Sequence, residues 1–297
     1  RIDDRPGLRA TGSTGAIRVT PVLNAFRAAW HNPRGRLGAV VLLIVCLMAI
    51  IAPPLLPDPR VQPDILAGSL PPALKHPFGT DQLSRDVLAR VVTGARISLS
   101  VALLAVALSM TLGAAVGLVS GYWGGAVDAA LMRVVDGALA IPRLFILLLV
   151  LAVAERIPIP ALIALIGATG WFATSRLVRA EVLRIRKEDY VRAAEALGAR
   201  RRRVIFRHLL PNTLGPLLVA ATLGVGDVIL LEAGLSFLGL GIQPPTPSWG
   251  GMILDSKEVL VSAPWVGIFP GLAIVVTVLS ANLFGDALRD AVDPRNA

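Results

Sequence analysis

Cysteine, aromatic and charged residues are all scarce in this chain. Only one cysteine, Cys46, is present among 297 residues, so no disulfide can form within the chain. Aromatic residues make up 5% of the sequence, and the net charge of +9 comes from arginines without interleaved aromatic side chains. Because sites for nucleic acid combine basic charge with aromatic stacking platforms, this pattern argues against a nucleic-acid partner.

The residue patterns of common catalytic and metal sites are also missing. A P-loop for ATP needs glycines followed by a lysine and a serine or threonine, and Lys75, Lys187 and Lys257 all lie outside such a pattern. The three histidines stand in different segments without a second ligand at helical spacing. No Gly-x-Ser-x-Gly elbow marks a nucleophile. We therefore expect no catalysis, no bound cofactor and no metal in this chain.

Apolar residues dominate instead. They make up 55% of the chain, and the mean hydropathy is +0.69. Runs of about 20 apolar residues match the thickness of a bilayer core, and without a period-2 alternation they favour helices over barrel strands. We predict an all-α polytopic membrane protein with six spans: Leu37–Leu56, Ser98–Val119, Val134–Val153, Ile157–Ser175, Thr213–Leu231 and Trp265–Leu283.

Arginine positions predict the topology. The tail 1–36 and the segment 176–210, between the fourth and fifth spans, are rich in arginine, which places both in the cytoplasm by the positive-inside rule. With six spans, the C-terminal residues 285–297 are cytoplasmic too, and 57–97 and 232–263 lie outside. Residues 98–284 then form the core of the membrane-embedded part. The first span is interpreted as a retained anchor, and a cleaved signal peptide is the alternative.

Two short helices are predicted outside the spans. Apolar residues at helical spacing from Leu83 to Val92, after candidate caps at Thr80 and Asp81, predict an amphipathic helix along the membrane surface or the bundle. We interpret it as a packing element that leads into the next span, with a direct role in ligand handling as the alternative. In the basic segment, Tyr190–Leu197 is rich in strong helix formers and is followed by Gly198, a typical helix-ending residue. Its small alanines suit insertion into a groove of another protein, and a solvated surface helix is the alternative.

The segment that starts at Tyr190 also resembles a family motif. Ala193-Ala194, then Gly198, then Leu210-Pro211 resembles the EAA loop of binding-protein-dependent ABC importer permeases. Residues 30 to 295 resemble the C-type subunit of the dipeptide/oligopeptide permeases. The matching stretches are His76-Pro-Phe-Gly-Thr-Asp81 with Arg85-Asp86, Gly94-Ala-Arg-Ile-Ser98, Met132-Arg-Val-Val-Asp136 with Ile141-Pro142, Leu235-Ser-Phe-Leu-Gly-Leu-Gly241 with Pro247-Ser-Trp-Gly250, and Gly285-Asp-Ala-Leu-Arg-Asp290 with Asp293-Pro-Arg295.

The resemblance implies a type I ABC importer permease fold with its permease core at 98–284, a location in the bacterial plasma membrane, and several partners. These are a homologous permease, two ATPase subunits or domains that use ATP and Mg²⁺, and an extracytoplasmic binding protein that delivers peptides; haem or a metal chelate is the alternative cargo. The implied ATPase-docking residues are Tyr190, Val191, Arg192, Ala193, Ala194, Glu195, Leu197, Gly198, Leu210 and Pro211. The chain departs from the motif at Arg192, where the family has an acidic residue, and Arg143 has no explanation in the family pattern.

Within the spans, two features stand out. Gly113, Gly117 and Gly121 are spaced four apart, which predicts close packing against another helix, with a lining role as the alternative. Asp227 lies near the middle of an apolar run, so it should face the bundle or a cavity. We interpret it as a candidate pathway residue, and the alternatives are a buried hydrogen-bonding group or a position nearer the membrane surface. A secondary transporter would need paired midplane charges and inverted repeats, and a channel would need a filter; neither pattern is found.

Overall fold

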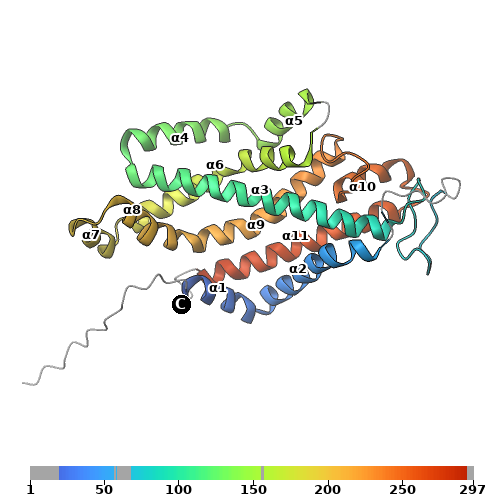
Figure 1. Cartoon of the computed structure of the whole chain (residues 1–297), viewed down its shortest axis with the longest axis horizontal. Helices are drawn as coiled ribbons and strands as arrows, with labels where there is room; N and C mark the ends of the chain where they lie inside the picture. Colours follow the sequence, from blue (N-terminus) through green and yellow to red (C-terminus); the bar gives the residue numbers. More distant parts are fainter. Residues whose placement is uncertain (1–19, 57, 59–67, 155–156, 293–297) are drawn as a thin grey trace, which may run out of the picture.

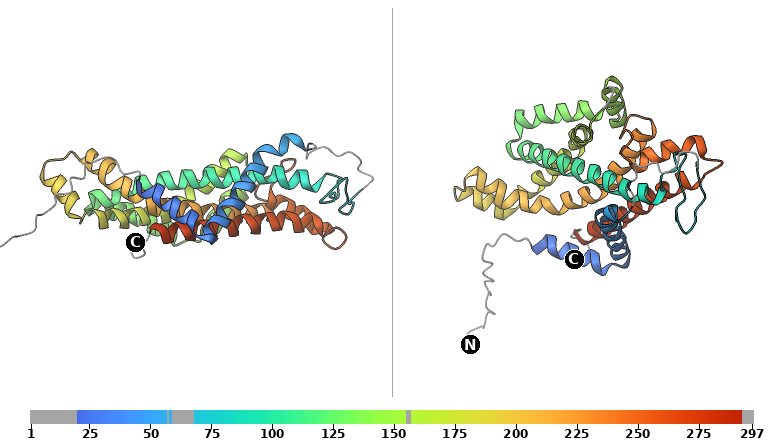
Figure 2. Two further views of the ribbon diagram at one scale, coloured as in Figure 1. Left: turned by 90° about the horizontal axis from the view of Figure 1, so that it is seen from below. Right: turned by 45° about the vertical axis from the view of Figure 1, so that its right-hand side comes forward.

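The computed structural model describes residues 20–56, 58, 68–154 and 157–292, and the regular elements within them are helices. Five of these helices are long and apolar enough to cross a membrane. They run side by side along the molecule (Figures 1 and 2). Their bounds are α2 Pro33–Ile51, α3 Val87–Trp123, α6 Ile159–Ile185, α9 Leu210–Phe237 and α11 Trp265–Val292. The predicted all-α polytopic architecture is confirmed.

The predicted third span, Val134–Val153, is broken. Helix α4 runs from Gly125 to Leu139 and helix α5 from Arg143 to Val153, and the two are bent by 75°. Proline at 142 disfavours the helical conformation of the residue before it and supplies no backbone N–H, which ends one helix and begins the next. The chain has six spans only if this bent pair counts as one.

Several spans are longer than their apolar cores predicted. Helix α3 begins at Val87, after the Asp86 side chain accepts a hydrogen bond from the backbone N–H of Ala89 at 2.8 Å. The amphipathic helix expected from Leu83 is therefore not a separate element, because Val87–Val92 form the first turns of α3. Helix α6 extends beyond the predicted end of its span to Ile185. Helix α11 extends to Val292, through residues predicted to be a cytoplasmic tail.

The basic N-terminal segment is partly helical. Helix α1 spans Thr20–His31, and Asn32 then caps α2 by accepting a hydrogen bond from the N–H of Arg34 at 3.0 Å. This part of the basic segment is thus helical, and residues 1–19 lie outside the described residues. Helix α2 ends before a 3₁₀ turn at Pro53–Leu55, where proline cannot continue the helix.

Helices α3 and α6 pack closely through the three predicted glycines. A Cβ atom at Gly113 would lie 2.5 Å from the Cβ of Thr174, and one at Gly117 would lie 2.6 Å from the carbonyl oxygen of Ser175. A Cβ at Gly121 would lie 2.8 Å from the Cβ of Val182. All three glycines therefore face α6, where any side chain would push the two helices apart.

The two ends of the bundle differ (Figure 1). At one end, here named the α7 end, lie α7 (Asp189–Ala196), α8 (Arg201–Val204) and a π-helical turn at Ile205–Leu209, together with the start of α1 and the end of α11. At the other, the α10 end, lie the segment from Gly68 to Asp86, helix α10 (Trp249–Ser256) and the 3₁₀ turn Lys257–Val259. Arginine-rich segments thus gather at the α7 end.

A buried ion-pair network closes the α10 end. Asp81 is fully buried and accepts hydrogen bonds from Arg85 Nε at 2.8 Å and from the guanidinium of Arg90. Arg90 also reaches Asp255 at 2.8 Å, which ties α3 to α10. Arg90, in the first turn of α3, therefore has carboxylate partners from two other segments, which compensate its charge in this buried site. The candidate cap Asp81 thus serves as the centre of this network.

Candidate functional site

Helix α7 is held to the bundle by a single buried side chain. Val191 is fully buried and belongs to the apolar cluster formed by the end of α6 and the turn before α9. This cluster includes Ile185 and Val204. Glu188 precedes the first helical residue, and its backbone carbonyl accepts from the N–H groups of Val191 and Arg192. The helix is therefore attached on one side and free on the other.

The helix ends in a Schellman motif. Gly198 has φ +81°, its N–H donates to the carbonyl of Glu195, and the N–H of Ala199 donates to the carbonyl of Ala194, both at 3.0 Å. Nothing packs around a Cβ position at Gly198, so the glycine is required by its backbone conformation alone. The turn leaves Leu197 88% exposed at the tip of the molecule. The predicted short helix with a glycine at its end is confirmed.

The residues predicted to dock an ATPase divide into two sets. Five of them are exposed: Tyr190, Arg192, Ala193, Leu197 and Gly198. Turned at least partly inward are Val191, Ala194, Glu195, Leu210 and Pro211. Leu210 and Pro211 begin α9, and Leu210 packs against the apolar cluster that contains Val191. Phe206, which sequence reasoning missed, is 66% exposed in the adjacent π-helical turn, and its apolar ring between arginines was the available signal.

Tyr190 links α7 to the start of α9. Its hydroxyl accepts a hydrogen bond from the Asn212 side-chain amide at 3.3 Å, and its ring centroid lies 6.0 Å from that of His208. Partial burial, reinforced by the Glu188 carboxylate, raises the pKa of the Tyr190 phenol, so the hydroxyl stays protonated near neutral pH. The ring therefore braces the helix against the bundle without adding charge.

Several arginines of the basic segment bind the helices together. Arg179 donates two hydrogen bonds of 2.5 Å to Asp128 on α4. Arg186 donates to the carbonyl of Tyr122 at 2.8 Å, and its guanidinium lies 5.0 Å from the centre of the Tyr122 ring. The part of 176–210 up to Ile185 is thus the end of α6, anchored to α3 and α4, rather than a loop.

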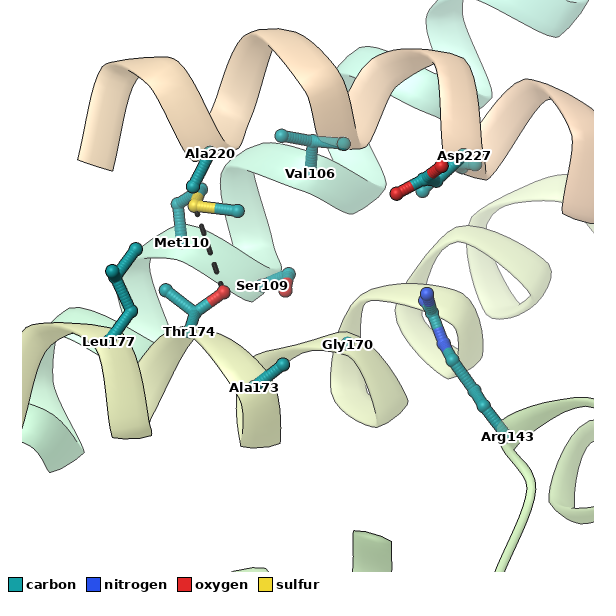
Figure 3. Close-up of a pocket in the computed structure, with 12 residues that line it drawn as sticks. Val106, Ser109, Met110, Arg143, Gly170, Ala173, Thr174, Leu177, Ala220 and Asp227 are labelled. Carbon is teal, nitrogen blue, oxygen red and sulfur yellow. Dashed lines mark hydrogen bonds between the residues drawn. The ribbon is translucent and has the colours of Figure 1, made fainter. Parts of the chain in front are cut away.

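A second feature is a cavity of about 240 Å³ between α3, α6 and α9 (Figure 3). Arg143, at the start of α5, reaches into it. Its Nη2 donates to the carbonyl of Ile166 at 2.5 Å, and its Nε donates to the hydroxyl of Thr169 at 3.2 Å. Arg143 thus has a position in the structure that the family pattern did not predict.

Asp227 lies on α9 on the opposite side of the same cavity. Figure 3 shows its carboxylate and the Arg143 guanidinium pointing toward each other from different helices. Asp227 is exposed, and it forms no hydrogen bond or ion pair with any residue of the described chain. Asp227 is therefore not a buried hydrogen-bonding group in this structure; it lines the cavity, and its role in a pathway stays a prediction.

A different carboxyl group takes the buried role. Glu232, one turn and a half beyond Asp227 on α9, is almost completely buried. Its carboxyl accepts from Ser98 at 3.2 Å and from Ser236 at 2.7 Å, and Ser98 in turn accepts from the N–H of Trp249 at 3.3 Å. Glu232 therefore joins α9 to α3 and α10. The sequence offered an acidic residue within an apolar run as a signal, but its partner Ser98 lies 134 positions away in the chain.

One known protein family and several known proteins are similar to this chain in sequence. A family model described as the binding-protein-dependent transport system inner membrane component matches residues 113–297. The dipeptide transport system permease protein DppC of Alkalihalophilus pseudofirmus is 40% identical over 93% of this chain and 91% of its own length. A putative peptide permease protein of Brucella suis is 44% identical over 97% and 96% of the two chains.

Two further proteins are similar to this chain, one in sequence and the other in fold. The oligopeptide transport system permease protein OppC of Bacillus subtilis is 38% identical over 89% of this chain and 86% of its own. A crystal structure of an amino acid ABC transporter with histidines aligns with a TM-score of 0.50 at 18% identity, covering 68% of this chain and 94% of that one, which supports the fold alone. The chain is a multi-pass membrane protein that belongs to the family of binding-protein-dependent transport system inner-membrane components.

Proposed function

We propose that this chain is a permease subunit of an ATP-driven importer that takes up peptides. The proposal assigns it a homologous permease as partner, two ATPase subunits or domains, and an extracytoplasmic binding protein that delivers the cargo. The observation that carries it is helix α7, anchored through Val191 and exposed through Ala193 and Leu197, in a chain of this family. Such a small, protruding helix fits the helix-in-groove mode of docking.

The orientation follows from arginine placement. The α7 end carries the exposed arginines of 200–203, and the positive-inside rule assigns that end to the cytoplasm. The start of α1 and the end of α11 lie at the same end, as an even number of spans requires. ATP and Mg²⁺ belong to the ATPase partners in this proposal, and the chain itself catalyses no reaction and binds no cofactor.

Coupling runs through rigid contacts. The apolar cluster around Val191 includes residues of α6 and of the turn that begins α9, so a displacement of α7 is transmitted to both helices. Arg179 and Asp128 connect α6 to α4 in the same way. Nucleotide-driven movement of the ATPases can thus shift the permease between inward-open and outward-open states, which differ in their contacts with cargo.

Peptides are proposed as the cargo because full-length relatives that are about 40% identical are named for dipeptides and oligopeptides. No residue described above favours haem or a metal chelate. An ATP-independent channel or secondary transporter would leave the exposed α7 surface without a role.

Co-purification of the ATPase tests the proposal. All presumed subunits are co-expressed, and the ATPase retained by this chain in detergent is compared between wild type, Gly198→Trp and Leu197→Asp. Gly198→Trp strains a positive-φ position, and Leu197→Asp places a charge on the exposed tip. Both variants should lose the ATPase and keep the partner permease. The matched control is Val261→Asp at the α10 end, where the side chain is also exposed.

Equal retention of the ATPase by all four proteins would contradict docking through α7. Absence of the ATPase from the wild-type preparation would contradict the importer assignment itself.

A further inference from the structure

Two opposite charges face the same cavity without pairing with each other. Arg143 donates hydrogen bonds to the carbonyl of Ile166 and to the hydroxyl of Thr169 on α6. Asp227 on α9 has no hydrogen bond or ion pair among the described residues. Ions within the hydrophobic thickness of a membrane are costly unless water, another ion or a ligand compensates them. Arg143 and Asp227 attract each other electrostatically but form no direct ion pair, so both charges stay accessible to a ligand that enters the cavity.

The remaining lining is uncharged, and part of it is small. Glycine or alanine occupies Gly170, Ala173, Ala220 and Gly224, and the other lining residues are Val106, Ser109, Met110, Thr174, Leu177 and Val228. No aromatic ring and no third charge lines the cavity. The walls therefore give little selection for one side chain over another, and the two charges provide the directional recognition.

A free peptide carries both complementary charges. Its α-amino group, with an ordinary pKa of about 7.7–8.0, is largely protonated at neutral pH, and its α-carboxyl group, with a pKa of about 3.5, is ionised. We infer that Asp227 binds the α-ammonium group of a peptide in transit and that Arg143 binds its α-carboxylate. This assignment rests on the proposed function. Recognition of the two ends alone lets one cavity pass peptides with different side chains.

The position of the pair also explains how cargo would be released. Arg143 is fixed to the backbone of α6, and Asp227 belongs to α9, which begins beside α7 at the π-helical turn. A movement of α7 that shifts α6 and α9 by different amounts changes the separation of the two charges. The affinity for a zwitterion then differs between the two states of the transporter, as coupled transport requires.

The test combines variants of the permease with blocked peptides. The complete transporter, with its binding protein and ATPases, is reconstituted in liposomes, and initial uptake rates are measured for Ala-Ala, N-acetyl-Ala-Ala and Ala-Ala amide. The variants are Asp227→Asn, Arg143→Gln and Arg143→Lys, and the control is Arg133→Gln, which removes an exposed positive charge of α4. Because the binding protein is the same throughout, the ratio of variant to wild type for each peptide isolates the contribution of the permease.

Each neutralised residue should affect only the peptides whose matching end is free. Asp227→Asn is expected to slow uptake of the free and amidated peptides about tenfold and the acetylated peptide less than twofold, because loss of one charge-assisted contact is worth about one power of ten. Arg143→Gln should slow the free and acetylated peptides similarly and spare the amide. Arg143→Lys should recover most uptake of the free peptide, and Arg133→Gln should change nothing.

Equal losses of uptake for all three peptides would overturn the inference and favour a structural or gating role. Unchanged uptake rates would also overturn it, because they would mean that neither charge contributes to transport. If wild type does not import the blocked peptides, dissociation constants for the purified complex without binding protein replace the rates, with the same pattern expected. Absence of measurable binding of Ala-Ala in that experiment would also overturn it. A wild-type complex that imports no peptide at all contradicts the proposed function, and this inference falls with it.

Discussion

Arg179 on α6 and Asp128 on α4 are joined by two parallel hydrogen bonds of 2.5 Å, one from Nε and one from Nη2. Asp128 also accepts from the hydroxyl of Ser120 on α3. Three helices thus meet at one carboxylate near the α7 end. Arg179, an arginine of the basic segment, therefore belongs to the framework of contacts among α3, α4 and α6 near α7. Its charge has a structural role as well as a role in topology.

Neutralising Asp128 should lower the stability of the complex more than it lowers the affinity for the ATPase. Asp128→Asn is expected to destabilise the complex by about 1 kcal/mol, because the bidentate pair is lost at a partly exposed site. The thermal unfolding midpoint of the complex in detergent measures this effect. Asp136→Asn is the control, since the Arg176–Asp136 pair is exposed on both sides. Equal midpoints for Asp128→Asn and wild type would contradict the proposed framework.

Gly117 should tolerate no side chain. Gly117→Ala places a Cβ 2.6 Å from the Ser175 carbonyl oxygen, so α3 and α6 must separate at a cost of about 2 kcal/mol. Gly137→Ala, in α4 with nothing near its Cβ position, should be neutral or stabilising by up to about 1 kcal/mol. Unfolding midpoints of the two variants check the difference, and a stable Gly117→Ala protein would mean that the helices pack less closely.

The buried network at the α10 end predicts a large effect from one carboxylate. Asp81→Asn leaves Arg85 and Arg90 without their central partner, which should cost about 3 kcal/mol because the site is buried. Asp255→Asn should cost less, since Asp255 is partly exposed and Arg90 keeps Asp81. Thermal unfolding again provides the measurement. The network account fails if the Asp255 variant is the less stable of the two.

Phe206 should contribute to ATPase docking although the family motif does not include it. Because the ring is largely exposed, Phe206→Ala should leave the unfolding midpoint unchanged and weaken ATPase binding about tenfold, as loss of an exposed aromatic anchor at an interface does. A titration of the ATPase onto the immobilised permease complex measures this. Val261→Ala at the α10 end serves as the control, and equal affinities for the two variants would remove Phe206 from the surface.

The sequence predicted those features that depend on local chemistry. The apolar runs indicated the long helices, the spacing of Gly113, Gly117 and Gly121 indicated a close helix contact, and the glycine at 198 indicated the end of α7. Asp227 could be assigned to a cavity because a lipid-facing carboxylate is too costly. Each of these inferences needed only the residue itself and its near neighbours along the chain.

Features that depend on distant partners were not predictable. The helix predicted from Leu83 to Val92 is continuous with α3, and the pairing of its Arg90 with Asp255, 165 positions away in the chain, could not be read from local spacing. Helix α6 extends past its apolar part because Arg179 finds Asp128. The placement of Arg143 opposite Asp227 depends on the break before α5, which hydropathy alone did not indicate.

The central claim is tested most directly by uptake of a labelled dipeptide into liposomes that contain this chain, its partner permease and the ATPases. With the binding protein outside and ATP available to the ATPases, labelled Ala-Ala should accumulate inside. Omission of ATP, omission of the binding protein, or the Leu197→Asp variant should each abolish accumulation. Accumulation without ATP would contradict the account, because it would mean that this chain forms a pathway that needs no ATPase.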